Sequence, residues 1–214
     1  MSVSLPNGAL VAIASGYGPA IPFSAVTNSN PAVGTFASGH GIILNDYLEI
    51  TSGWTRLTQK IIRAGVVTAT SAAFAGQDTT LTSIYPVGGG SGSVREITGW
   101  TQLAQIVNSS TSGGVQQFLT YQFLEGDNQL RIPTFKDPFG IQFSIADDPT
   151  LAGYLLTVAA NDDRLPRAVR VTLPNQSVLL YNSYISVNKT PTLSVNNLME
   201  VTVTLSLLAE PVRY

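Results

Sequence analysis

The alternation of hydrophobic and polar positions is clearest in the last third of the chain. Residues 141–145 read Ile-Gln-Phe-Ser-Ile, and residues 201–207 read Val-Thr-Val-Thr-Leu-Ser-Leu. Successive side chains of a strand point to opposite faces, so each segment predicts a strand with one buried face. Residues 169–173 and 178–187, joined by the Pro-Asn-Gln-Ser turn of residues 174–177, predict an antiparallel pair.

One segment has the spacing of a helix instead. Residues 147–149 read Asp-Asp-Pro, which offers an acidic cap, a proline in the first turn and negative charge near the positive end of the helix dipole. The apolar stripe that follows consists of Leu151, Ala152, Leu155, Leu156 and Ala159. Together these features predict a helix over about 147–161.

Proline and glycine punctuate the rest of the chain. Residues 1–40, with four prolines and five glycines, predict an extended amino-terminal arm with one strand at residues 10–14. Residues 86–93 read Pro-Val-Gly-Gly-Gly-Ser-Gly-Ser and predict a flexible projecting loop, with a domain linker as the alternative. Residues 209–214 predict a free tail. We expect one mainly β domain over residues 1–214.

Both tryptophans stand in the same short phrase. Residues 49–61 read Glu-Ile-Thr-Ser-Gly-Trp-Thr-Arg-Leu-Thr-Gln-Lys-Ile, and residues 96–106 read Glu-Ile-Thr-Gly-Trp-Thr-Gln-Leu-Ala-Gln-Ile. Tryptophan is scarce, so two matched frames favour a duplicated strand-rich unit; chance similarity between common β residues is the alternative. We expect both copies to be mostly extended.

Charge is scarce in this chain. Charged residues make up 11% of the sequence, against about 25% in an average soluble domain, and the net charge is -2. A protein that binds nucleic acid through its phosphates needs clustered cations, so this composition argues against that class. Low net charge promotes association, and we expect a surface largely covered by partners; the alternative is an ordinary, slightly adhesive monomer.

The residues that carry catalytic or metal chemistry are few. The chain has no cysteine, and its single histidine, His40, stands in a glycine-containing loop. No nucleophile elbow appears, and residues 86–93 lack the lysine of a phosphate-binding loop. The adjacent acids at 147–148 and 162–163 lie at the expected helix ends. We therefore predict no catalytic, cofactor or metal site, and no membrane span or secretory signal.

The tightest group of cations follows the expected helix. It consists of Arg164, Arg167 and Arg170. These side chains are candidates for binding carboxylates of a neighbouring subunit. A solvated turn explains the group equally well.

At this point several phrases resemble one family, the tail tube proteins of long, non-contractile-tailed bacteriophages. Most of the likeness lies in residues 147–154 and 174–182; residues 51–54, 97–102 and 211–214 also resemble a branch of that family. The resemblance covers most of residues 40–214 and is weakest over the amino-terminal arm. It implies a β-sandwich or β-barrel flanked by one helix. Lambda-like relatives carry an additional carboxy-terminal immunoglobulin-like domain, which we do not expect here because the chain stops at Tyr214.

The resemblance also implies a function. Six subunits would form a ring, and stacked rings would form a hollow tube whose inner strands close a continuous barrel without exposed edges. The tape measure protein would occupy the lumen before the viral genome is ejected through it, and tail tip and terminator proteins would be further partners. The chain would be synthesised in the host cytoplasm and end in the virion tail. It would not be an enzyme.

Two sets of residues become candidates within that function. DNA must slide through the tube, so its wall should repel phosphate. The candidate lumen-facing acids, which lie beside expected strands, are Asp46, Glu49, Glu96, Glu125 and Asp127. The candidate contacts between rings are residues 1–30 and the loop residues Gly88, Gly89, Gly90, Ser91 and Gly92.

Other functions stay open at this stage. The chain is also compatible with another self-assembling β protein, such as a capsid decoration or pilus-like subunit. A carbohydrate-binding β-sandwich would need exposed aromatic side chains, which Trp54, Trp100, Tyr121 and Tyr181 could supply. An enzyme is the least favoured reading.

Overall fold

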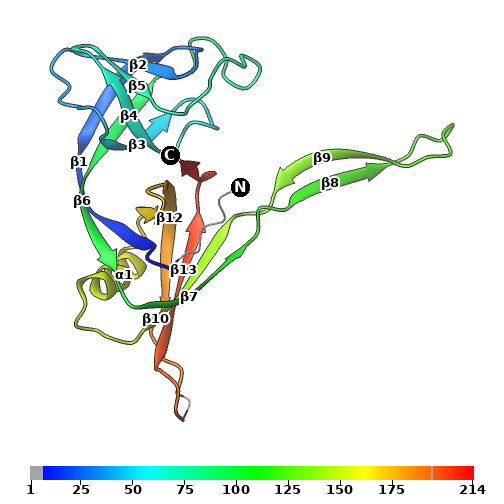
Figure 1. The fold of residues 1–214 in the computed structure, drawn as a ribbon. Helices are drawn as coiled ribbons and strands as arrows, with labels where there is room; N and C mark the ends of the chain where they lie inside the picture. Colours follow the sequence, from blue (N-terminus) through cyan, green and yellow to red (C-terminus); the bar gives the residue numbers. More distant parts are fainter. Residues whose placement is uncertain (1–6, 194) are drawn as a thin grey trace.

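The computed structural model describes residues 7–193 and 195–214, and it consists of a two-part β body with a long arm standing away from it (Figure 1). The mainly β fold with one flanking helix is therefore confirmed. The strands are β1 (Leu10–Val26), β2 (Ala32–Phe36), β3 (Tyr47–Ser52), β4 (Ile61–Val67), β5 (Ser71–Phe74), β6 (Gly92–Leu103), β7 (Ile106–Ser112), β8 (Gln116–Tyr121), β9 (Leu130–Lys136), β10 (Gly140–Ala146), β11 (Arg167–Thr172), β12 (Val178–Asn188), β13 (Glu200–Leu207) and β14 (Val212–Arg213); the helix is α1 (Ala152–Asp163).

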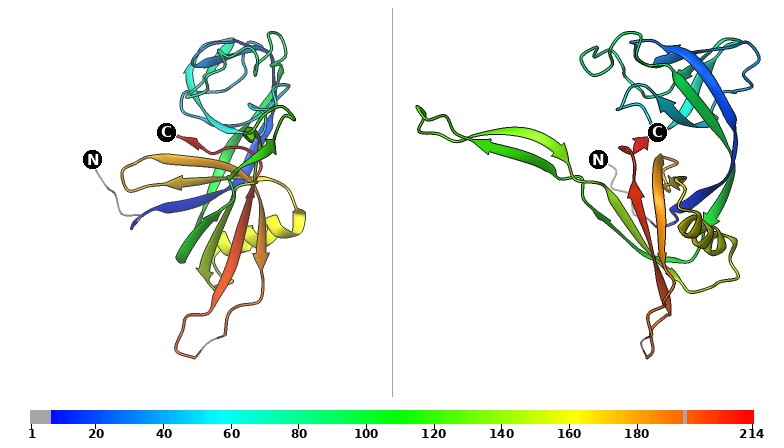
Figure 2. Two further views of the ribbon diagram at one scale, coloured as in Figure 1. Left: turned by 90° about the vertical axis from the view of Figure 1, so that its right-hand side faces the viewer. Right: turned by 180° about the vertical axis from the view of Figure 1, so that it is seen from behind.

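The first part of the body is a closed barrel. Its strands follow the order β2-β5-β4-β3-β6-β1, and the end of β1 pairs with β2 to close the circuit. Seen from the side, the barrel is a ring at one end of the molecule (Figure 2). Closure gives these strands a partner on each side, so the barrel has no long free edge.

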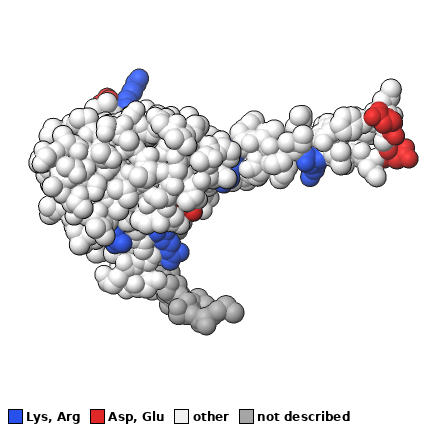
Figure 3. Space-filling view, turned by 90° about the horizontal axis from the view of Figure 1, so that it is seen from above, with Lys and Arg blue, Asp and Glu red and all other residues white. Residues whose placement is uncertain are grey.

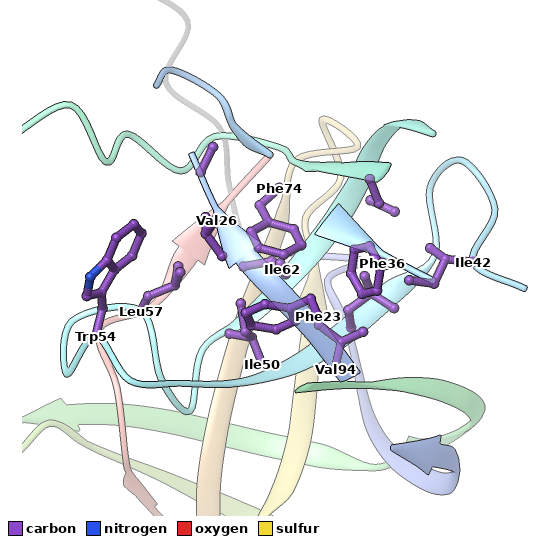
Figure 4. Packing of buried hydrophobic residues seen from close by; sticks show 14 residues of the cluster. Phe23, Val26, Phe36, Ile42, Ile50, Trp54, Leu57, Ile62, Phe74 and Val94 are labelled. Atoms are coloured by element: carbon purple, nitrogen blue, oxygen red, sulfur yellow. The ribbon is translucent and has the colours of Figure 1, made fainter. Parts of the chain in front are cut away.

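Aromatic side chains fill the barrel. Phe23, Phe36 and Phe74 meet edge to face, with ring centroids 5.7 to 6.5 Å apart, and β-branched residues such as Ile50 and Ile62 pack around them (Figure 4). These side chains come from strands far apart in the sequence. Their burial is what holds the two ends of the barrel sheet together.

The second part of the body is an open sheet. Beyond the barrel the strand order continues β6-β1-β11-β12-β13-β10-β7. The helix covers one face, where Phe143, Ile145, Val203 and Leu205 belong to a second buried cluster. Gly153 lets the helix approach β6 closely, because a Cβ there would lie 2.3 Å from the backbone oxygen of Gln102. Strands β1 and β6 run through both parts.

The helix begins later than the sequence indicates. It starts at Ala152 rather than near residue 147, and its cap residue Leu151 makes no side-chain hydrogen bond. The Asp148 carboxylate instead accepts hydrogen bonds from the backbone N–H of Thr150, at 3.0 Å, and from its hydroxyl, at 2.6 Å. The acidic pair therefore shapes the turn before the helix, not its first turn.

Two predicted free segments belong to the body instead. The prediction of an extended arm is wrong for residues 10–36, which form β1 and β2; residues 1–6 of that prediction lie outside the described residues. The tail over residues 209–214 does not hang free. Its β14 pairs with Leu179 and Leu180.

The two tryptophan phrases fold differently. The first leaves its strand after Ser52 and turns, which buries Trp54 to 2% exposure and lets its Nε1–H donate to the backbone oxygen of Pro86 at 2.9 Å. The second stays in β6 as far as Leu103, and Trp100 pairs there with Ala14. The expectation of two extended copies is therefore right only for the second.

Candidate assembly surfaces

The open sheet presents one uncharged polar face. In β10 the residues that alternate with the buried Ile141, Phe143 and Ile145 point away from the helix. Strand registers align their neighbours in three rows across β7, β10, β13 and β12. These rows are Ser112-Gly140-Ser206-Tyr184, Ser110-Gln142-Thr204-Ser186 and Asn108-Ser144-Thr202-Asn188. None of these twelve residues carries a charge, and their polar groups are hydroxyls and amides; we call these three rows the uncharged face. The next pair along it, Ala146 and Glu200, ends the face with one carboxylate.

This four-stranded region has two open edges. Among the described residues, β7 pairs only with β10, and the last five residues of β12 pair only with β13, because the β11 partner ends opposite Ser183. All neighbours are antiparallel, so β7 runs opposite to β12. A β7 edge of one copy therefore has the right direction to continue the antiparallel sheet at the β12 edge of another copy. Strand β7 has no charge and no proline, the usual protection of an edge.

The arm is a two-stranded ribbon formed by β8 and β9, and it projects well beyond the rest of the molecule (Figures 1 and 2). Leu119 pairs with Ile132 on one face, and Phe118 pairs with Pro133 on the other. The large side chains are about half exposed or more, Phe135 reaching 67%. An isolated hairpin is at best marginally stable in water, so a ribbon that is apolar on both faces indicates a docking element.

This hairpin was not predicted from the sequence. The second strand contains Pro133 and alternates poorly, which argues against a central strand. Proline is tolerated because the ribbon has only two strands, each with a free edge. The signal that could have been used is the turn-rich Glu-Gly-Asp-Asn stretch of residues 125–128 between two apolar segments.

The structure does not bring the five candidate lumen acids together. Asp46 accepts from the backbone N–H of Ile43 at 2.7 Å in a barrel turn, and Glu96 pairs with Leu48 in the barrel wall. Glu125 and Asp127 lie in the turn at the tip of the arm, and Glu49 lies in β3. None of the five belongs to the uncharged face of the open sheet.

Glu49 is buried, so the expectation that it faces a lumen is wrong. Its carboxylate forms an ion pair with Arg95 and accepts from the Asn182 amide at 3.1 Å. Since Glu49 lies in β3 and Asn182 in β12, this pair of contacts joins the barrel to the open sheet. Burying a carboxylate is costly without such partners, which explains why they converge here.

Two tyrosines make further connections between the parts. The Tyr17 hydroxyl accepts from the backbone N–H of Ala168 at 2.8 Å, and burial raises the pKa of Tyr17. The Tyr214 hydroxyl accepts from the backbone N–H of Arg63 and donates to the backbone oxygen of Ala75, each at 2.9 Å. No sequence pattern singled out these connections, because their partners are distant in the chain.

The candidate loop between rings packs onto the barrel. A Cβ at Gly90 would lie 2.9 Å from the Trp54 ring, and the backbone oxygen of Ser91 accepts from the backbone N–H of Gly53 at 3.0 Å. Gly92 is already part of β6, and Gly89 also lies against Trp54. The prediction of a projecting loop is therefore wrong for residues 89–92. Of the four candidate glycines, Gly88 alone could take a Cβ without meeting another atom within 4 Å.

The three candidate cations are not equivalent. Arg167 forms a 2.5 Å ion pair with Asp163 of its own chain, and the backbone N–H of Leu165, together with that guanidinium, holds the pKa of Asp163 below its ordinary value. Arg170 stacks over Trp100 at 4.7 Å from the ring centroid. Arg164 is exposed at the end of α1. The structure thus engages two of the three arginines within their own chain.

A cleft lies where the arm joins the body. Its volume is about 460 Å³, and it is bordered by the turn after β3, the base of the arm and residues 208–210. Arg56, Lys60 and Lys136 line it, with Glu210 as the single carboxylate. Glu210 forms a 2.5 Å ion pair with Lys136. Burial lowers the pKa of Lys60, whose ammonium donates to the Gln77 side chain at 3.2 Å.

Chemistry of other kinds finds little support in the described residues. No group of three or more potential metal ligands occurs in them, and no helix there has the length and apolar character needed to cross a bilayer. His40 stabilises its own loop, because its Nδ1 accepts a hydrogen bond from the backbone N–H of Ile42 at 3.1 Å. Trp54, one of the four aromatics considered for a sugar platform, is buried.

Comparison with known proteins adds one assignment. A family model described as phage tail tube protein matches residues 52–214 of this chain, which is more than half of it. No curated protein matches significantly. A solved structure described as the cryo-EM structure of the anti-feeding prophage baseplate, 6-fold symmetrised, is similar at a TM-score of 0.41 with 12% identity, covering 55% of this chain and 85% of that one. At that TM-score the likeness supports no conclusion about function.

Proposed function

Because this chain belongs to the phage tail tube protein family, and is thus a structural component of the virion tail, we propose that it assembles into stacked six-membered rings that form a hollow tube. The genome is ejected into the host through this tube. The tape measure protein fills the lumen beforehand, and tail tip and terminator proteins bound the tube at its ends. The tail is of the long, non-contractile kind, and the chain performs no catalysis.

The observation that carries this proposal is the pair of open edges on the four-stranded region. Strand β7 of one copy adds antiparallel to the free part of β12 of the next, and repetition around a ring closes the sheet into a barrel. The two edges belong to different surfaces of one copy, so the contact is head to tail. Such contacts give a closed ring when the rotation between copies fits.

The uncharged face is then the wall that meets DNA. Phosphate binding depends on neutralisation by cations, and the three rows of this face contain none. Their hydroxyl and amide groups hold a layer of water without fixed charge. This wall lets DNA slide because it does not hold phosphate. In this proposal a neutral polar wall takes the place of the repelling acidic wall that the sequence predicted.

The arm is the contact between rings in this proposal. Its apolar side chains on both faces need cover, and a tube built from one kind of chain offers only copies of that chain over most of its length. Residues 1–30 and the exposed end of the loop at Gly88 stay secondary candidates for the same role.

Electron microscopy of the purified chain tests the assembly, and labelling tests the wall. We expect hollow tubes with a six-fold cross-section; trimers, caps or solid fibres would instead support a capsid decoration or pilus-like protein. The chain has no cysteine, so Gln142→Cys introduces a unique thiol. Bulky maleimides should label it in free subunits and fail in intact tubes, whereas Asp78→Cys on an exposed barrel loop should stay reactive in both. Equal labelling of the two variants in tubes contradicts the wall assignment.

A further inference from the structure

The tip of the arm combines charge with exposed apolar side chains. Glu125 and Asp127 are the only carboxylates between residues 113 and 136, and they gather at the far end of the arm (Figure 3). Next to them Phe123 is 57% exposed and Leu124 is fully exposed. The turn has a defined shape, because the Gln122 amide donates to the backbone oxygen of Gly126 at 2.8 Å.

The cleft at the base of the arm has the opposite charge. Of its four charged groups, Glu210 forms an ion pair with Lys136 and also acts at longer range on Arg56 and Lys60, so three cations share one carboxylate. Among the described residues the Lys60 ammonium donates a hydrogen bond only to the neutral Gln77 amide, and burial lowers the pKa of Lys60. An additional carboxylate in the cleft would stabilise the charged form of Lys60.

The cleft also offers apolar contact. Tyr85 from the barrel, Phe135 from the arm and Leu208 from the carboxy-terminal segment line it. A ligand with carboxylates beside a leucine and a phenylalanine would therefore find a partner for each kind of group.

A tip cannot reach the cleft of its own chain. Residues at the base of the arm, such as Gln116 and Lys136, line the cleft. The arm extends away from the body (Figures 1 and 3), so its tip lies far from its own cleft. Folding back would break the register of β8 and β9, which runs from Gln116 to Tyr121. The occupant must come from another molecule.

We propose that the arm tip of one copy, residues 122–129, inserts into the arm-base cleft of another copy, where Glu125 and Asp127 face Arg56 and Lys60. Leu124 and Phe123 pack against the apolar lining. The proposal rests on the proposed self-assembly and names the contact that the arm makes. Tip and cleft are different surfaces, so each copy both gives and receives an arm, and the contact propagates from copy to copy.

Charge exchange between the two sites tests the pairing. Glu125→Lys with Asp127→Lys, and separately Arg56→Glu with Lys60→Glu, should each raise the protein concentration needed for tube formation by at least about tenfold. The four changes in one chain should recover most of the loss, because opposite charges again meet. Asp78→Lys, on an exposed barrel loop, serves as the control and should leave tube formation unchanged. Failure of the combined variant to recover, while each double variant remains folded by circular dichroism, overturns the pairing.

Cross-linking gives a second measurement that does not depend on loss of assembly. Chains carrying only Asp127→Cys are mixed with chains carrying only Thr58→Cys, a residue of the cleft lining, and allowed to form tubes before oxidation. We expect a disulfide-linked dimer in mixed tubes and none when Asp78→Cys replaces Asp127→Cys. Mixed tubes without the cross-link overturn the tip-to-cleft contact and leave tube assembly intact. Absence of tubes from the unchanged chain overturns the proposed function itself.

Discussion

The barrel and the arm both contain phenylalanines and aliphatic residues, but the barrel buries them and the arm exposes them. In the barrel, Phe23, Phe36 and Phe74 are almost completely buried and every strand is paired on each side. In the arm, Phe118 and Phe135 are at least half exposed, and among the described residues the two strands pair only with each other. The comparison teaches that apolar content does not distinguish a core from an interface. What distinguishes them is whether the chain's own topology can cover the side chains.

The open sheet lies between these extremes. Its apolar face is covered by the helix of the same chain, whereas its polar face is uncovered and two of its edges are unpaired among the described residues. The barrel thus pairs all its strands within one chain, the open sheet leaves two edges unpaired among the described residues, and the arm contacts the body only at its base. Three experiments can break or sharpen this comparison.

Removal of the arm should have the largest effect. Replacing residues 115–137 with a short Gly-Ser turn takes away the ribbon and leaves both buried clusters intact. We expect no tubes, while the free energy of unfolding of the subunit changes by less than ~1 kcal/mol because an isolated hairpin contributes little stability. Electron microscopy and urea unfolding measure the two quantities. Normal tubes from this variant would show that the arm is dispensable.

A matched pair of phenylalanine substitutions comes next. Phe74→Ala in the barrel should lower the free energy of unfolding by about 3–5 kcal/mol, because it opens a cavity in a packed core. Phe118→Ala in the arm should change it by less than ~0.5 kcal/mol and weaken tube formation instead. Urea titration of the two purified variants makes the comparison. Similar losses of stability in both would mean that the arm is part of the subunit's own core.

The smallest expected effect on tube formation comes from a single lysine, placed either on an open edge strand or on a strand of the closed barrel. Val107→Lys places a charge on the open β7 edge and should raise the concentration needed for tube formation about tenfold, or ~1.4 kcal/mol. Thr35→Lys, on an exposed position of β2 in the closed barrel, should leave it unchanged. Sedimentation of tubes across a concentration series measures both. An equal response of the two variants would argue against β7 as a ring contact.

The sequence predicted the elements whose signals are local. Alternation over residues 141–145 and 201–207 located β10 and β13. The apolar stripe after Pro149 located α1 but indicated the wrong face, because Ala152, Leu155 and Ala159 are exposed, whereas the buried residues of the helix are Gly153, Thr157 and Ala160. The start of the helix was missed because Asp148 bonds to Thr150 instead of capping the helix. A side-chain hydrogen bond to a turn competes with one to a helix end, and residue type alone does not decide between them.

Features that depend on distant partners could not be predicted. Closure of the barrel requires Phe23 to meet Phe74, and the proline-rich composition of residues 1–40 gave no sign of that contact. The sequence around Glu49 gives no sign that this carboxylate is buried, because its partner Asn182 is 133 residues away. The glycines after Pro86 indicated mobility, whereas their lack of side chains serves close packing on Trp54.

The two strands shared by the barrel and the open sheet have a mechanical consequence. Strands β1 and β6 cross the junction as one paired ribbon, and the contacts of Glu49, Tyr17 and Tyr214 brace it on neighbouring strands. Rotation of the barrel against the open sheet would have to bend this ribbon and break these contacts, so we expect each subunit to move as one rigid body. If such subunits form a tube and the tube bends, the deformation should then occur at the interfaces between copies.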